Sequence, residues 1–248
     1  AYRQMNLDAV QICDQSFAVG CFHGVTEAML LKEGPKRIKD IESGCLKFFP
    51  PQISTDYTGC IHGAGHGVYT WEAGNLGKAL KDCDIFDIKY RPFCYDGVFM
   101  ENASNLENNV FNKKDPWKIC TDLDDAYHYN CARYQSQVFL TIFNNQPDFI
   151  KQIGENCAKG PTLLLSETCY QSLGFFVSQN SMGKVQPILD KCSSILEENG
   201  VAMCIIGASM ENIFQKYPDF KSSANTLCGK ISGVKKEVCF NNINRMIQ

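Results

Sequence analysis

The regular spacing of the fourteen cysteines constrains the fold of this 248-residue chain more than any other feature. Read as successive pairs, most are 11 or 12 residues apart, and 23 to 26 residues separate one pair from the next. From the second pair onward, the second cysteines follow one another at intervals of 34 to 38 residues. The pairs are Cys13–Cys21, Cys45–Cys60, Cys83–Cys94, Cys120–Cys131, Cys157–Cys169, Cys192–Cys204 and Cys228–Cys239. A fixed internal period is the signature of a repeat architecture, here seven units of about 36 residues.

A unit of that length accommodates two helices and two turns. The segments that end at the first cysteine of a pair, such as Val185–Cys192, carry apolar residues at three- and four-residue spacing, which indicates a helix with one buried face. A second helix is predicted to begin around the second cysteine, as in Cys204–Gln215. The predicted units are 1–34, 35–74, 75–110, 111–145, 146–182, 183–218 and 219–248.

Each cysteine pair falls where one predicted helix ends and its antiparallel partner begins. The two Cα atoms then lie within the roughly 5.5 Å that a disulfide requires, and closing a loop of about ten residues contributes roughly 2–3 kcal/mol. Thiolate metal binding is the alternative, but zinc fingers and ribbons use close pairs such as C-x-x-C, which this sequence lacks. So many cysteines, in an even number, favour an oxidising compartment, so the predicted location is secreted, periplasmic or cell-surface.

From residue 13 to residue 239 this layout resembles secreted, cysteine-rich proteins built from Sel-like repeats, relatives of the tetratricopeptide repeat. The closest local match is Cys169–Gly174, which reads CYQSLG. The resemblance implies an all-α fold, a right-handed αα-superhelical solenoid of seven disulfide-stapled hairpins that forms one domain with a concave surface. It implies no particular chemistry, because such folds host both binding and enzymatic functions.

Composition excludes several classes of function. A net charge of −3 with both signs well mixed provides no basic stripe for nucleic acid and no polybasic membrane patch. No apolar run approaches the roughly 18 residues that span a bilayer. The chain begins at Ala1 without a charged leader, so we expect a mature form whose signal peptide has been removed. Asn102-Ala103-Ser104 matches the glycosylation sequon.

Alignment of the units on their second cysteine reveals a polar position two residues later. It holds His23, His62, Asp96, Arg133, Gln171, Ile206 and Asn241. The position six residues after the cysteine holds Glu27, His66, Met100, Gln137, Phe175, Met210 and Arg245. Because the two positions are four residues apart, they share one helical face. Ionisable residues concentrate there in the first three units.

Helices in such arrays lie about 8–10 Å apart, so side chains at equivalent positions can converge. Imidazoles and carboxylates are ligands for zinc, iron, manganese or copper. The predicted ligand set is His23, Glu27, His62, His66, Asp96 and Glu101. The His-x-x-x-His spacing is suited to metal binding, but Gly63 stands where the zincin motif has its glutamate, so a general base would come from Glu27 or Glu101. A metal-free polar pocket and structural polar packing are the alternatives.

Glycines accompany these residues inside the predicted helices, where each costs about 1 kcal/mol relative to alanine. Gly24, Gly63 and Gly97 directly follow the polar position, and Gly65 and Gly67 are also in the second unit. Either close helix packing or access of a ligand to the backbone would compensate for this cost.

The leading hypothesis is an extracytoplasmic helical repeat protein with a metal or polar-ligand site in units one to three; if it is an enzyme, a metal-assisted hydrolase is the favoured class. The competing hypothesis is a non-enzymatic scaffold whose concave face binds a protein, peptide or glycan partner. A subunit of a larger extracellular assembly is a third alternative.

Overall fold

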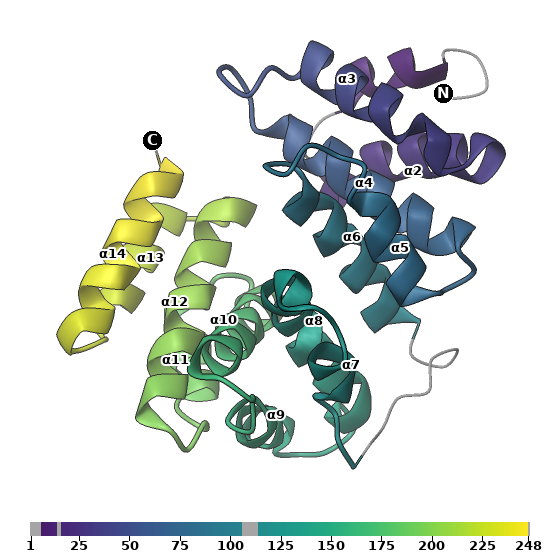
Figure 1. Ribbon diagram of the computed structural model, residues 1–248. Helices are drawn as coiled ribbons and strands as arrows, with labels where there is room; N and C mark the ends of the chain where they lie inside the picture. Colours follow the sequence, from purple (N-terminus) through teal and green to yellow (C-terminus); the bar gives the residue numbers. More distant parts are fainter. Residues whose placement is uncertain (1–5, 14–15, 106–113, 248) are drawn as a thin grey trace. The chain divides into compact units, whose positions relative to one another are not determined.

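The structure is a computed structural model that describes residues 6–13, 16–105 and 114–247, with side chains throughout except at 16–19. Every regular element in these three ranges is a helix. Contacts divide the chain into two compact units, each larger than one predicted 36-residue repeat (Figure 1). From here on, unit 1 means Ala1 to Phe111 and unit 2 means Asn112 to Gln248. The predicted boundary between the third and fourth hairpins, at residues 110 and 111, lies outside the described residues.

Unit 1 consists of helical hairpins. The first element of each is, in chain order, the 3₁₀ helix η1 (Asn6–Ile12), η2 (Pro35–Arg37) continuing into α3 (Ile38–Phe48), and α5 (Leu76–Cys83). The second helices are α2 (Ser16–Glu33), α4 (Asp56–Trp71) and α6 (Arg91–Ser104). Helix α4 packs against both α2 and α6, so these second helices form a row.

Unit 2 repeats this plan. Its first helices are α7 (Lys118–Thr121), α9 (Phe149–Cys157), α11 (Val185–Cys192) and α13 (Phe220–Gly229). Its second helices are α8 (Asp125–Phe143), α10 (Leu163–Asn180), α12 (Glu198–Gln215) and α14 (Gly233–Ile247). Contacts run from α8 to α10, from α10 to α12 and from α12 to α14, again in a row (Figure 1).

All seven predicted disulfides are confirmed, and no cysteine is free. Their Cα–Cα distances are 5.4 to 5.8 Å. The second helices begin earlier than predicted, however: α10 starts at Leu163, six residues before Cys169. The cause is a cap, because the Thr162 side chain accepts a hydrogen bond from the backbone N–H of Leu165. The disulfides therefore join the end of one helix to the second turn of the next.

Adjacent second helices approach closely where small residues stand at their crossing points. A Cβ on Gly65 would collide with the carbonyl oxygen of Cys94, and a Cβ on Gly97 would collide with that of His62. These two glycines let α4 and α6 pack backbone against backbone. Their helix-propensity cost is thus balanced by close packing.

The same contact recurs in unit 2 at corresponding positions, three and five residues after the second cysteine. A Cβ on Gly174 would collide with the Cys204 carbonyl, and one on Gly207 with the Gln171 carbonyl. Between α8 and α10 serines replace the glycines, and the Ser136 hydroxyl donates to the Ser172 hydroxyl at 2.9 Å. Both units therefore set the register of neighbouring helices in the same way.

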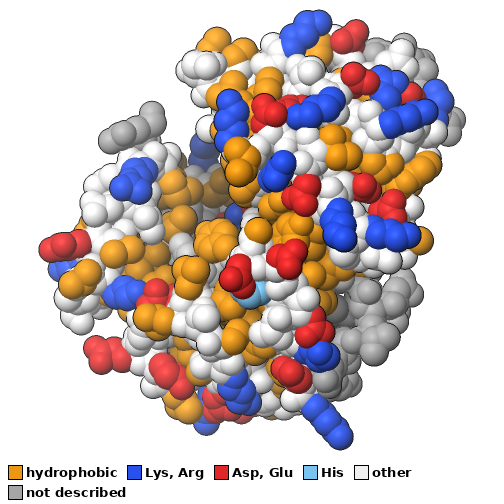
Figure 2. All heavy atoms as spheres, in the orientation of Figure 1, with side chains coloured by type: hydrophobic (Ala, Val, Ile, Leu, Met, Phe, Trp, Pro, Cys, Tyr) orange, Lys and Arg blue, Asp and Glu red, His pale blue; other side chains and the backbone are white. Residues whose placement is uncertain are grey.

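The outer surface carries both charge signs. Figure 2 shows acidic and basic side chains interspersed over one face of each unit, with apolar side chains between them. Among the described helices, none combines the length and apolarity needed to cross a bilayer.

Candidate metal centre

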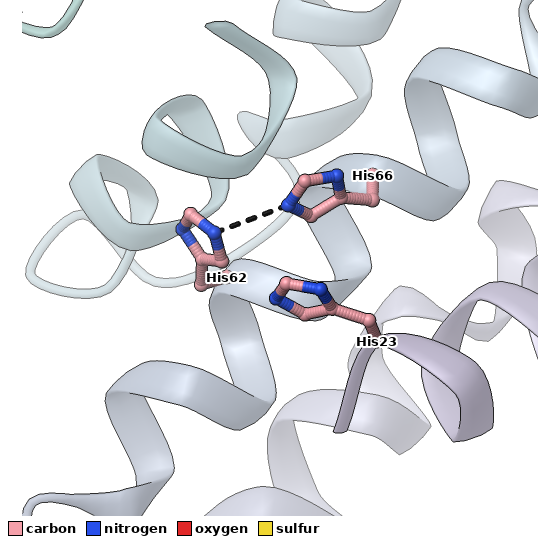
Figure 3. A group of neighbouring side chains, drawn as sticks. All are labelled: His23, His62 and His66. Atoms are coloured by element: carbon pink, nitrogen blue, oxygen red, sulfur yellow. Dashed lines mark hydrogen bonds between the residues drawn. The ribbon is translucent and has the colours of Figure 1, made fainter. Parts of the chain in front are cut away.

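Three of the four histidines in the chain converge between α2 and α4. His23, His62 and His66 each offer a ligand atom, and these atoms all lie within 4.8 Å of one another. The ring centroids of His23 and His66 are 4.2 Å apart, and those of His62 and His66 are 4.9 Å apart. In Figure 3 the His23 ring, from α2, lies against the pair of rings that α4 contributes. The structure thus brings together three members of the predicted ligand set.

Glycines on α4 make this convergence sterically feasible. A Cβ on Gly63 would lie 3.0 Å from the carbonyl oxygen of Phe22, and a Cβ on Gly67 would lie 3.0 Å from the Cα of Glu27. Both glycines face α2, so their missing side chains allow His23 to reach the α4 histidines. By contrast, nothing lies within 4 Å of a Cβ built on Gly24. Of the two explanations for the glycines, close packing is what the contacts at Gly63 and Gly67 show.

The two α4 histidines point their Nε2 atoms at each other. His62 Nε2 and His66 Nε2 are 3.1 Å apart (Figure 3). Two imidazole nitrogens bound to one tetrahedral zinc at 2.0–2.1 Å would be about 3.3 Å apart. The pair is therefore already spaced as two ligands of one ion, while His23 would have to turn towards them to complete the set.

His66 is also held from the opposite side by Glu101 on α6. The His66 Nδ1 N–H donates to Glu101 Oε2 at 2.7 Å. The other carboxylate oxygen accepts from the Asn105 side-chain amide at 2.6 Å. A carboxylate behind a histidine is the usual arrangement around a metal-binding imidazole. Sequence reasoning did not predict the contribution of Asn105.

His23 is half-buried, and its Nε2 is a buried atom without a hydrogen-bond partner among the described residues. Burial, followed by the nearby His66, lowers the pKa of His23 to about 4, although the charge of Glu101 opposes the shift. The imidazole is therefore neutral near pH 7, which is the form that binds metals. A buried nitrogen with an unused lone pair is costly unless something binds it.

The closely spaced group of ligand atoms does not include Glu27 or Asp96. Glu27 Oε1 accepts a long hydrogen bond, 3.5 Å, from the Thr70 hydroxyl, and Asp96 is buried on α6. The fourth histidine, His128, donates from Nε2 to the Leu123 carbonyl at 2.9 Å, which is a structural contact. Asn102 of the sequon is 3 % exposed, so the folded chain does not present it for glycosylation.

The contact between His23 and His66 joins the two aligned sequence positions across neighbouring helices, and unit 2 contains the same contact. There Arg133 lies over the Phe175 ring at 5.9 Å, and the Gln171 amide reaches Met210 Sδ at 2.9 Å. The same two repeat positions therefore meet across neighbouring helices in both units, and in unit 1 they are occupied by histidines.

A further sequence signal marks the outer carboxylate. The tripeptide Met-Glu-Asn occurs at Met100–Asn102 and again at Met210–Asn212, in each case six residues after a second cysteine. In both copies the glutamate, Glu101 or Glu211, stands seven residues after the second cysteine. Comparing that position across the repeats identifies both carboxylates from the sequence.

In comparisons with known proteins, no family model, curated protein or solved structure matched the chain. The structure shows a disulfide-rich helical protein with a histidine triad. Seven intrachain disulfides are typical of an oxidising compartment.

Proposed function

We propose that the protein binds a divalent metal ion through His23, His62 and His66, in an oxidising compartment outside the cytoplasm. The convergence of three imidazole nitrogens within 4.8 Å of one another carries this proposal. The unpartnered Nε2 of His23 and the spacing of the α4 pair support it, because a shared ion would satisfy all three nitrogens at once.

Zinc fits this donor set best. Imidazole nitrogen is a preferred zinc ligand, and three histidines with a fourth position left for an exogenous ligand are typical of catalytic rather than structural zinc. Iron, copper and manganese are the competing ions. Bound zinc would supply the Lewis acidity for metal-assisted hydrolysis, which is the reaction class we propose for the site.

Metal analysis of the purified protein after equilibrium dialysis against zinc tests the proposal. We expect one zinc ion per chain in the wild type and none in His62→Ala or His66→Ala. His128→Ala is the matched control, because that histidine lies outside the triad, and it should keep its zinc. A wild-type protein without zinc, or retention of zinc by both α4 variants, would contradict metal binding. Hydrolysis of an activated ester that depends on added zinc and on His62 would support the reaction class.

A scaffold function is the second candidate, and a cavity of ≈ 340 Å³ in unit 2 favours it. Val201, Ile205 and Ile231 line its apolar wall, with Lys230 and Lys235 beside them. We propose that such a surface, in an array resembling Sel-like repeats, receives a peptide segment of a partner. Panning a random-peptide library should yield peptides that bind the wild type but not Val201→Glu, whose zinc content serves as the folding control. Selected peptides that bind Val201→Glu as well as the wild type would contradict peptide binding at this cavity.

A further inference from the structure

We infer that Glu101 is the positioning residue of the metal centre: it holds His66 in the tautomer whose Nε2 carries the lone pair and faces the triad. The inference rests on the proposed metal binding, and it assigns Glu101 a role different from that of a direct ligand. Its basis is the contact of Glu101 with His66 on the ring edge opposite the triad.

The chemistry of the contact determines the proton position. An ionised carboxylate has only acceptor oxygens, so the 2.7 Å contact between Glu101 Oε2 and His66 Nδ1 requires a proton on Nδ1. A neutral imidazole carries only one N–H, so its Nε2 then keeps a lone pair. That Nε2 is the atom that faces His62 at 3.1 Å. Glu101 thus turns the metal-binding lone pair of His66 towards the centre of the triad before any ion arrives.

Glu101 is itself held rigidly. Asn105, the residue directly after α6, donates its side-chain amide to Glu101 Oε1 at 2.6 Å and to the Glu101 carbonyl at 3.0 Å. Both carboxylate oxygens therefore have defined partners, one on α4 and one at the C-terminal end of α6. His66 is almost completely buried, with a side chain 8 % exposed, whereas that of Glu101 is 30 % exposed. A carboxylate that accepts a hydrogen bond from a buried imidazole fixes the orientation of the ring.

Glu211 provides a matched comparison within the same chain. It stands on α12 at the position that corresponds to Glu101 on α6, and it is 7 % exposed. Its Oε1 accepts from the side-chain amides of Gln179 at 2.7 Å and Gln215 at 2.8 Å, with no histidine involved. The scaffold therefore accommodates a carboxylate at this position with or without a metal centre, and contact with His66 is what gives Glu101 its role.

Two measurements on Glu101→Met test the inference, because methionine has a similar length but offers the Nδ1 N–H only a weak, uncharged sulfur acceptor. The first is the His66 tautomer in the metal-free protein, read from the ¹⁵N shifts and couplings of its ring. The second is the zinc dissociation constant from competition with a chelator. We expect the wild type to carry its proton on Nδ1 and Glu101→Met to shift towards Nε2–H. The zinc affinity of Glu101→Met should fall about 10- to 100-fold.

Two further variants make the result specific. Glu101→Gln retains an acceptor oxygen and should recover part of the affinity and the Nδ1–H tautomer. Glu211→Met removes the corresponding carboxylate in unit 2 and should leave zinc affinity within about twofold of the wild type, whatever its effect on thermal stability.

Each contrary outcome has a distinct meaning. An unchanged tautomer and affinity in Glu101→Met would overturn the positioning role. Loss of zinc as complete as in His62→Ala would make Glu101 a ligand and would equally overturn it. A wild type that binds no zinc but has the expected tautomers would refute the proposed function while supporting the orientation of His66 by Glu101.

Discussion

Units 1 and 2 build the same helix–helix contact from different side chains. In unit 1 the contact pairs His23 with His66, with ring centroids 4.2 Å apart. In unit 2 it pairs Arg133 with Phe175, the guanidinium lying 5.9 Å from the ring centroid. Because small residues set both registers, the difference in chemistry comes from the side chains at two fixed positions.

The second carboxylate sharpens this contrast. Glu101 accepts a hydrogen bond from His66 Nδ1–H, whereas Glu211 accepts hydrogen bonds from the side-chain amides of Gln179 and Gln215. A carboxylate at this position therefore does not by itself define a metal site. The comparison shows that both units place a carboxylate at this position. Only in unit 1 does this carboxylate contact an imidazole.

The largest expected effect is the creation of a second metal site in unit 2. The triple variant Arg133→His, Gln171→His, Phe175→His reproduces the triad at the α8–α10 contact, with Glu211 at the position of Glu101. We expect two zinc ions per chain in place of one, and a micromolar site would correspond to about 8 kcal/mol of binding free energy. Metal analysis and calorimetry measure this. A stoichiometry that stays at one would show that backbone spacing, rather than side-chain identity, distinguishes the units.

The next effect concerns the glycines at the helix crossings. Gly97→Ala and Gly207→Ala should each lower the free energy of unfolding by about 3 kcal/mol, because the new Cβ would collide with a carbonyl oxygen of the neighbouring helix. Urea unfolding with intact disulfides measures both. Only Gly97→Ala, at the α4–α6 crossing, should also weaken zinc binding. Equal loss of zinc affinity in both variants would contradict a site confined to unit 1.

A smaller effect of opposite sign is expected at Gly24, which occupies the same repeat position as Gly97. No atom in the part of the chain that the structure describes lies within 4 Å of a Cβ built there, so alanine meets no obstacle. Gly24→Ala should raise the free energy of unfolding by about 0.5–1 kcal/mol through helix propensity. A destabilised variant in the same urea experiment would refute the view that this glycine, unlike Gly97, has no packing role.

The smallest effect comes from Asp82, which precedes the first cysteine of its hairpin. Burial, then Glu72, raises the pKa of Asp82 to about 6, although Lys78 opposes the shift, and its Oδ2 has no hydrogen-bond partner. In the second hairpin of unit 2 the residue before the first cysteine is Asn156, whose amide donates to the Gln152 carbonyl.

Because the folded-state pKa of Asp82 exceeds its ordinary value of 3.8, this group favours the folded state most below pH 3.8 and loses that contribution as pH rises through 6. Asp82→Asn should therefore raise the Tm slightly at pH 7.5, by less than about 4 °C, and not at pH 3.5. Scanning calorimetry at both pH values decides this. An equal gain at both would refute a titrating cause.

Much of the helical scaffold was predictable because its determinants are local. Once the flanking segments are helical, a disulfide between cysteines 11 or 12 residues apart brings together the adjoining ends of two successive helices. The helix starts were less predictable: Thr162 caps α10 well before Cys169, and an apolar period does not mark a cap.

The candidate site was predictable only as a set of positions. Alignment on the cysteines identified His23, His62 and His66 together, because equivalent positions on neighbouring helices face the same interface. It could not separate them from Glu27 and Asp96, which share that alignment. A side chain's reach across an interface depends on helix rotation and on distances set by other residues.

The sequence by itself thus determined the hairpins, their disulfide pairing and the concentration of ionisable residues near the N-terminus, because spacing along one chain controls each of these. Only the tertiary structure decided which side chains meet. Gly63 and Gly67 remove the Cβ atoms that would keep α2 away from α4, and so His23 reaches the α4 histidines. The crossing of α4 and α6 brings Glu101 to Nδ1 of His66, while Nε2 of the same ring faces His62.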